Sequence, residues 1–145
     1  MLEKQGVTKA VIFVTTICVL LLLILIFLPR HVHTESFKPV FLNGHSLENR
    51  IIYYFNLSDE EEVPPFEAKI KVVNARNATP IERANVTIYG HGLTFSNFTD
   101  ENGFTSILLE GYSIPKGTDS ITLTIEITKD GYRKLRWEDY VELHR

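Results

Sequence analysis

Four asparagines form the clearest chemical pattern in the sequence. Each begins an Asn-x-Ser/Thr triplet whose middle residue is not proline, and they are Asn56, Asn77, Asn85 and Asn97. This triplet is the acceptor of N-linked glycans on the outer side of a membrane. Eight asparagines would give only about one such triplet by chance. We therefore expect N-linked glycans on at least two of the four sites.

The other reactive side chains do not form a recognisable site. His31 and His33 lie two residues apart without a third metal ligand nearby, so we interpret them as polar residues at a membrane interface. Asp100 and Asn102 have the spacing that begins a calcium loop, but the later acidic ligand is missing. The chain has no nucleophile-elbow, phosphate-loop or zinc-protease motif. We predict a non-catalytic protein without cofactor or metal.

An uncharged segment near the N-terminus predicts a membrane anchor. Residues 10–28 contain no charged side chain. As a helix they would span about 28 Å, close to the hydrocarbon thickness of a bilayer. No A-x-A cleavage site follows, so we expect an uncleaved signal anchor over 10–29 that contacts the lipid bilayer. The only cysteine, Cys18, is expected to pack within this span.

The charges that flank this span predict its orientation. Lys4 and Lys9 favour a short cytoplasmic tail over 1–9 and an extracellular C-terminal domain. Residues 31–145 hold 12 basic and 17 acidic side chains, a net charge of −5. Such a surface repels phosphate backbones and anionic headgroups, which argues against a nucleic-acid partner. Without cysteine pairs, the outer domain must be stabilised by its core alone, which suits an archaeal cell surface.

Two regions follow the anchor. Prolines and the acidic run 59–62 predict a stalk over 30–65, with one possible strand at 50–57. From 66 to 145, short alternating segments predict a β-sandwich domain, most clearly at 121–128. The prediction is an all-β fold, a small Ig-like or transthyretin-like antiparallel β-sandwich of six or seven strands behind a single N-terminal transmembrane helix.

Turn residues and aromatic residues complete this picture. Gly90, His91 and Gly92 predict a turn, and Asp130-Gly131 predicts a tight hairpin. Large aromatic side chains are usually buried, so we expect four of them in the core. They are Phe95, Phe104, Tyr132 and Trp137.

Three segments resemble carboxypeptidase regulatory-like domains, also called transthyretin-like or prealbumin-like. Thr79–Ile88 resembles their x-P-[IL]-x-x-A-x-V-x-[IL] run, Thr99–Phe104 their T-D-x-x-G-x-[FT] turn, and Lys129–Tyr132 their closing x-x-G-Y. The three segments occur in family order across residues 67 to about 135. The resemblance implies a non-catalytic accessory or adhesive module, and it supplies no active-site residues.

Three residues of these segments also have expected structural roles. Ala84 is small where the chain would cross between sheets. Asp100 is expected to accept hydrogen bonds from backbone N–H groups of its own loop, and Gly103 to adopt a positive φ.

A second resemblance is to archaeal type IV pilin-like proteins, which also join an apolar helix to a glycosylated β-sandwich. Residues 4–8 are similar to their processing site, with cleavage after Gly6. Gln5 stands where a basic residue is usual, and Pro29 would interrupt the long helix of a filament core.

Together these patterns predict a protein that acts in cell-surface structure, in adhesion or as an accessory subunit of a membrane complex, through protein partners. The alternatives are a pilin-like filament subunit and a glycan-binding module. A glycan-binding module needs an exposed aromatic platform, for which Tyr89, Tyr112 and Tyr140 are candidates.

Overall fold

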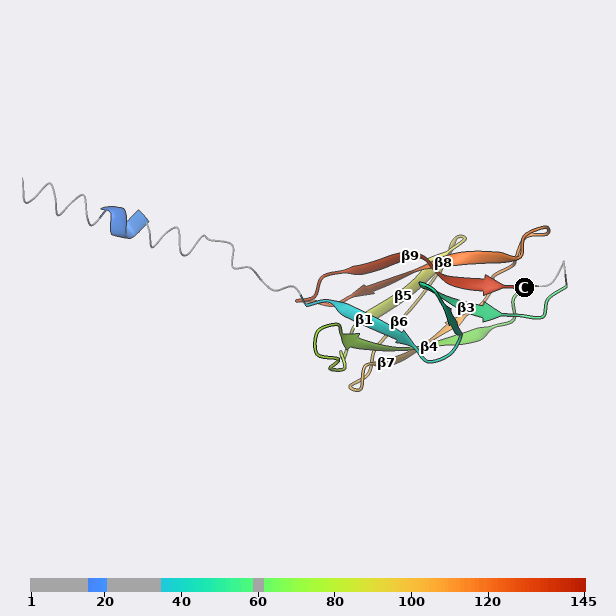
Figure 1. Cartoon of the computed structure of the whole chain (residues 1–145), viewed down its shortest axis with the longest axis horizontal. Helices are drawn as coiled ribbons and strands as arrows, with labels where there is room; N and C mark the ends of the chain where they lie inside the picture. Colours follow the sequence, from blue (N-terminus) through green and yellow to red (C-terminus); the bar gives the residue numbers. More distant parts are fainter. Residues whose placement is uncertain (1–15, 21–34, 59–61) are drawn as a thin grey trace, which may run out of the picture. The chain divides into compact units, whose positions relative to one another are not determined.

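A computed structural model describes residues 16–20, 35–58 and 62–145 (Figure 1). The chain divides into two units, Met1–His33 and Thr34–Arg145. In the first unit, residues 16–20 are α-helical. Within the described ranges, no helix combines the length and hydrophobicity needed to cross a membrane. The predicted tail, the rest of the predicted anchor, His31 and His33 lie outside the described residues.

The second unit is all β, as predicted, and contains two sheets (Figure 1). The small sheet has the order β1-β4-β7, with β1 at Phe37–Phe41, β4 at Phe66–Asn74 and β7 at Phe104–Leu109. The large sheet has the order β2-β3-β9-β8-β5-β6. Its strands are β2 (His45–Leu47), β3 (Arg50–Tyr54), β5 (Asn85–Gly90), β6 (Leu93–Phe98), β8 (Ser120–Thr128) and β9 (Leu135–His144).

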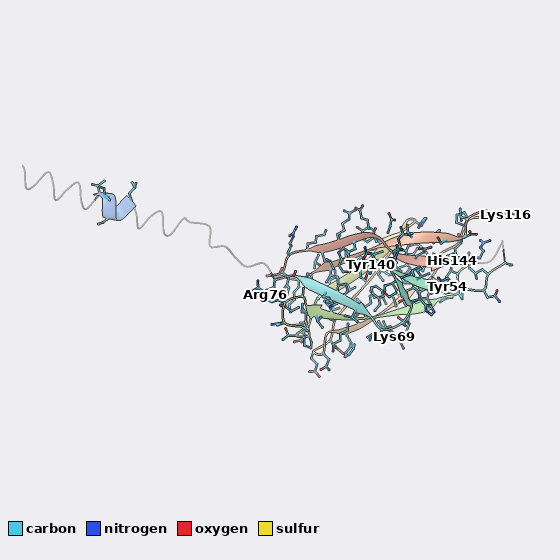
Figure 2. The ribbon with its side chains drawn as sticks, in the orientation of Figure 1. Tyr54, Lys69, Arg76, Lys116, Tyr140 and His144 are labelled. Atoms are coloured by element: carbon cyan, nitrogen blue, oxygen red, sulfur yellow. The ribbon has the colours of Figure 1, made fainter. Side chains whose placement is uncertain are left out.

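Both sheets contribute to one hydrophobic core. Every second residue of β8 is buried in it, namely Ile121, Leu123, Ile125 and Ile127, which confirms the predicted alternation. From the small sheet, Ala68, Ile70 and Val72 of β4 join the same core. Figure 2 shows the side chains of both sheets, among them Tyr54 of β3, which is exposed.

The predicted turn at residues 90–92 is confirmed. His91 and Gly92 have φ values of 51° and 81°. Both are positive, as the two central residues of a type I′ hairpin turn require. The turn therefore joins β5 directly to its antiparallel partner β6.

The stalk predicted over 30–65 is wrong for the described residues of this range. β1 pairs with β4 from Phe37↔Asn74 to Phe41↔Ile70. The strand expected at 50–57 exists as β3 and pairs with β9. Proline indicated a linker in the sequence, but Pro39 lies on an edge strand, where proline is tolerated.

The sandwich also differs from the predicted antiparallel arrangement. β3 runs parallel to β9, with Ile51 opposite Val141 and Tyr54 opposite His144. Parallel neighbours need a long crossover connection, and the chain between these two strands provides it.

A bulge interrupts the pairing of β9 with β8. Leu123 lies opposite Val141, whereas Ile125 lies opposite Trp137, so β9 carries two extra residues between these pairs. An even number of extra residues keeps the inward and outward sides of the strand unchanged. Trp137 and Val141 therefore stay on the same side of β9, as the alternation of residues 135–143 in the sequence predicts.

Of the four aromatic side chains predicted in the core, three pack against it and one does not. Phe95, Tyr132 and Trp137 are partly buried and pack against the core. Phe104 is 38% exposed, so its predicted core position is wrong. The buried neighbours on β7 are Thr105 and Ile107, and the alternation of the strand turns Phe104 outward.

Two of the connections that cross between the sheets meet at Thr99. One joins β4 to β5 and the other joins β6 to β7. The buried Thr99 hydroxyl donates to Ile81 O at 2.6 Å and accepts from Ala84 N at 2.8 Å. One side chain thus links the β6–β7 connection to the β4–β5 connection.

The turn after Thr99 has the predicted geometry. Asp100 Oδ1 accepts from the backbone N–H of Asn102 at 2.9 Å and of Phe104 at 2.8 Å. Gly103 has a φ of 76°, and its carbonyl oxygen accepts from Val72 N at 2.8 Å. A Cβ at Gly103 would lie 2.5 Å from Val72 O, so only glycine fits this approach to β4.

We predict that Thr99→Val destabilises the domain. The substitution keeps the shape but leaves Ala84 N and Ile81 O without their buried partner, which costs about 1–3 kcal/mol of unfolding free energy. Thr105→Val is the matched control, because Thr105 is also buried but its Oγ1 has no hydrogen-bond partner among the described residues. Urea denaturation measures both variants. Equal stability losses would contradict the role given to Thr99.

Candidate binding grooves

A strained turn and the β9 bulge line the same part of the large sheet. Glu48 and Asn49 connect β2 to β3, and Glu48 has a φ of 52°. Asp139 in the bulge has a φ of 51°. A positive φ is unfavourable for residues other than glycine and must be held by surrounding contacts. Backbone strain of this kind concentrates at functional sites.

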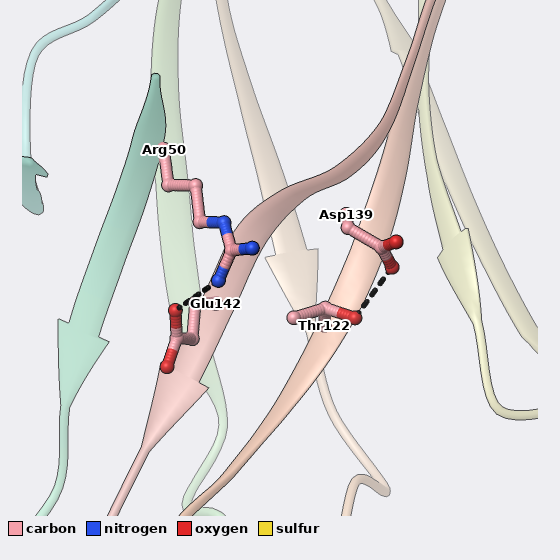
Figure 3. A network of polar contacts seen from close by, with 4 residues as sticks. All are labelled: Arg50, Thr122, Asp139 and Glu142. Atoms are coloured by element: carbon pink, nitrogen blue, oxygen red, sulfur yellow. Dashed lines mark hydrogen bonds and ion pairs between the residues drawn. The ribbon is translucent and has the colours of Figure 1, made fainter. Parts of the chain in front are cut away.

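Two polar contacts hold this region (Figure 3). Arg50 Nη1 on β3 lies 3.3 Å from Glu142 Oε2 on β9. The Thr122 hydroxyl on β8 donates to Asp139 Oδ1 at 2.6 Å. The second bond ties the extra residues of β9 to the neighbouring strand, so the bulge has a fixed shape.

The first groove, which we name the aromatic groove, has a volume of about 530 Å³. It is lined by Glu48, Asn49, Arg136, Trp137, Glu138 and Tyr140. The rings of Trp137 and Tyr140 have centroids 4.6 Å apart and are tilted by 44°. Burial raises the pKa of Tyr140, so its hydroxyl stays protonated and can donate a hydrogen bond. Figure 2 labels Tyr140.

The second groove, which we name the acidic groove, adjoins the first and has a volume of about 600 Å³. It is lined by Leu47, Glu48, Asn49, Arg50, Ile52, Glu138, Asp139 and Glu142. Glu48, Asn49 and Glu138 line both grooves. Both volumes lie in the range of small-ligand sites.

The walls of the two grooves together carry more negatively than positively charged side chains. Their walls carry four carboxylates and two guanidinium groups. Arg50 pairs with Glu142, and Arg136 Nη2 lies 2.8 Å from Glu138 Oε1. Glu48 and Asp139 therefore leave the walls with a net negative charge. In the described part of the chain, no three His, Cys, Asp or Glu side chains are arranged to hold a metal ion.

The four predicted glycan acceptors lie on four different elements. Asn56 follows β3 and is exposed, and Asn77 lies in the exposed β4–β5 connection. Asn77 Oδ1 accepts from Thr79 N at 3.1 Å and from Thr79 Oγ1 at 2.8 Å. These bonds order the triplet and use the side-chain oxygen, not the nitrogen to which a glycan is attached.

The other two acceptors are more constrained. The alternation of residues 85–89 predicts that Asn85 faces solvent, but in the structure it is only half-exposed and its Oδ1 is buried without a hydrogen-bond partner in the described residues. Asn97 Nδ2 donates to Ser106 O of β7 at 2.9 Å. That nitrogen is the atom that would carry the sugar.

The three candidate platform tyrosines have different positions. Tyr112 is 1% exposed, so the platform predicted there is wrong. Tyr89 is half-buried on β5. Only Tyr140 lines a groove among the pockets described here. Sequence analysis missed the contribution of Glu48, Asn49 and Asp139, because the bulge and the β2–β3 pairing that bring them together have no clear local signal.

Comparisons of the chain with protein-family models, with curated proteins and with solved structures find no match. The resemblance to carboxypeptidase regulatory-like domains therefore depends on the motif residues alone.

We predict glycans on Asn56 and Asn77 and none on Asn85 or Asn97. Attachment needs an accessible side-chain nitrogen, which the hydrogen bond of Asn97 and the partial burial of Asn85 restrict. Glycopeptide mass spectrometry of the protein from a glycosylating host measures the occupancy of each site. Asn77→Gln should remove one glycan and Asn85→Gln none. Full occupancy of Asn97 would show that its hydrogen bond to Ser106 O does not prevent glycan attachment.

We also predict that Tyr112 contributes to alkaline unfolding. Burial raises the pKa of its hydroxyl from 10.0 to about 12. Between these pH values the unfolded chain loses the proton while the folded chain keeps it, so the unfolding free energy is intact below about pH 10 and falls as the pH rises toward 12. The hydroxyl has no hydrogen-bond partner among the described residues, so Tyr112→Phe should change stability little at pH 7.

The expected result is a shallower stability loss for Tyr112→Phe in urea denaturation between about pH 10 and 12. Tyr54→Phe, at a side chain that is 56% exposed, is the control and should follow the wild-type curve. An unchanged slope in Tyr112→Phe would contradict the prediction.

Proposed function

We propose that this protein is a non-catalytic, membrane-anchored module of the cell surface that works by binding a partner in the aromatic groove. Such a module would serve in adhesion or as an accessory subunit of a membrane complex. The observation that carries the proposal is the aromatic groove itself. Its Trp137–Tyr140 pair lies beside the β2–β3 turn, where Glu48 has a positive φ, and beside the β9 bulge, which is hydrogen-bonded to β8. Rigid aromatic side chains supply contact area at a low cost in conformational entropy.

The membrane part of the proposal comes from the sequence. The uncharged segment 10–28 has the length of a bilayer span, and the predicted orientation places the sandwich outside. Two exposed glycan triplets, at Asn56 and Asn77, agree with that side of the membrane. The motif resemblance to carboxypeptidase regulatory-like domains supports an accessory or adhesive role, because it implies a module without active-site residues.

A carbohydrate is the second candidate for the partner. The aromatic groove combines ring surfaces with Asn49, Glu48 and Glu138. Ring faces can pack on the C–H groups of a sugar, while carboxylate and amide groups accept and donate hydrogen bonds to its hydroxyls. The volume of about 530 Å³ is sufficient for a small oligosaccharide.

The test uses two variants of the full-length protein. Tyr140→Ala removes a wall of the groove, and Tyr89→Ala removes a half-buried tyrosine that lines neither groove. In mild-detergent purification from native membranes, we expect the chains that co-purify with the wild type to be lost with Tyr140→Ala and kept with Tyr89→Ala. Oligosaccharides are titrated in parallel with the emission of Trp137, which is the only tryptophan.

A bound sugar should shift the Trp137 emission, and Tyr140→Ala should weaken its binding by about tenfold or more, as expected for a central aromatic contact. Circular dichroism and urea denaturation establish that each variant is folded. Partners and sugars that bind a folded Tyr140→Ala as tightly as the wild type would exclude the groove as the site.

A further inference from the structure

The outer face of the small sheet has a charge opposite to that of the domain. Lys38 on β1 and Lys69 and Lys71 on β4 point outward, as the alternation of both strands requires, and Figure 2 labels Lys69. The one carboxylate of β4 on this side, Glu67, accepts a hydrogen bond from Ser106 Oγ at 3.0 Å. Although residues 31–145 have a net negative charge, this face of the small sheet is therefore locally basic.

Apolar side chains alternate with these lysines. Val40, Lys71 and Phe104 lie opposite one another on β1, β4 and β7. In the next row, Leu42 N donates to Lys69 O at 2.8 Å. Val40 is 40%, Leu42 53% and Phe104 38% exposed. We name the surface formed by Lys38, Val40, Leu42, Lys69, Lys71 and Phe104 the basic face.

The basic face contains a shallow depression. The depression, of about 290 Å³, is lined by Leu42, Lys69, Asp100, Phe104, Thr105 and Ser106. Asp100 is already engaged, because its Oδ1 accepts two backbone hydrogen bonds. The ammonium group of Lys71 lies 4.8 Å from the centroid of the Phe104 ring. The charged end of Lys71 thus lies against an exposed aromatic ring of the same face.

We propose that the basic face binds the anionic headgroups of a phospholipid bilayer. Lysine is suited to this position because its stem packs on apolar groups while its ammonium group reaches phosphates. Exposed leucine and phenylalanine side chains add contacts at the boundary between headgroups and acyl chains. Three lysines give only weak binding on their own.

Attachment to the same membrane strengthens this weak contact, and in this respect the proposal rests on the proposed anchor at 10–29. Residues 30–36 lie between that anchor and β1, and seven residues extend at most about 25 Å. The bilayer surface is then continuously within reach of β1, and binding becomes intramolecular. An acidic protein segment would fit the charge of the face equally well, and the test below distinguishes it from the membrane.

The test uses full-length protein in nanodiscs of phosphatidylcholine, with or without an equal share of phosphatidylglycerol. In a Cys18→Ser background, a polarity-sensitive dye is attached at Leu42→Cys. The control dye is attached at Ser96→Cys, on an exposed residue of β6 in the large sheet. We expect phosphatidylglycerol to shift the Leu42 dye to shorter wavelengths and to leave the Ser96 dye unchanged.

The shift should be lost at high salt, which screens exposed charges, and in the folded triple variant K38Q/K69Q/K71Q. Equal emission of the Leu42 dye in both nanodiscs, or a shift that persists in the triple variant, would overturn the proposal. A Leu42 dye that responds to added poly-glutamate but not to phosphatidylglycerol would assign the face to an acidic protein segment and would also overturn it.

Failure of the anchor gives a different result. A chain that does not remain with the nanodisc in size-exclusion chromatography would refute the proposed anchor without testing the basic face. Sedimentation of that chain with phosphatidylglycerol vesicles, but not with phosphatidylcholine vesicles, would still support the basic face. Its absence from both pellets would refute the basic face as well.

Discussion

The buried hydroxyl of Thr99 connects two of the segments that cross between the sheets, the β4–β5 and β6–β7 connections. It donates to Ile81 O and accepts from Ala84 N, so each partner has its polar atom satisfied away from water. The adjoining turn brings Gly103 against Val72 of β4. This contact determines where β7 begins and which of its side chains face outward. The hydrophobic core and the composition of the basic face both depend on it, because a shift of one residue would exchange Phe104 with Thr105.

Charge is separated between two regions of the sandwich. The grooves of the large sheet have an excess of carboxylates, whereas the basic face of the small sheet carries three lysines. The net charge of the whole domain sums these two regions, so it predicts neither the acidic grooves nor the basic face. If the proposed anchor tethers the protein, one surface can orient the domain and the other can contact a partner. Each interaction can then be weak, because tethering raises the effective concentration.

Local patterns in the sequence were sufficient for much of the fold. Strict alternation predicted β8, and the residue types at 99–104 predicted the Asp100 hydrogen bonds and the positive φ of Gly103. β1 was missed because Pro39 indicates a linker and because its partner β4 lies about 30 residues away, beyond any local pattern. The grooves were missed for a similar reason. They depend on a non-local parallel pair and on a bulge at Asp139, and neither follows from local side-chain periodicity.

The position of β9 has a consequence for biosynthesis. It is an inner strand of the large sheet, between β3 and β8, although it follows the other eight described strands along the sequence. β2 and β3 therefore have no place in the large sheet until β9 has left the ribosome. Until then Ile51 and Tyr53 lack the strand that they pair with, and the unpaired edges of β3 and β8 are open to association with other chains. The nascent protein thus passes through a stage at which chaperone protection is most valuable, and that stage ends only with the synthesis of β9.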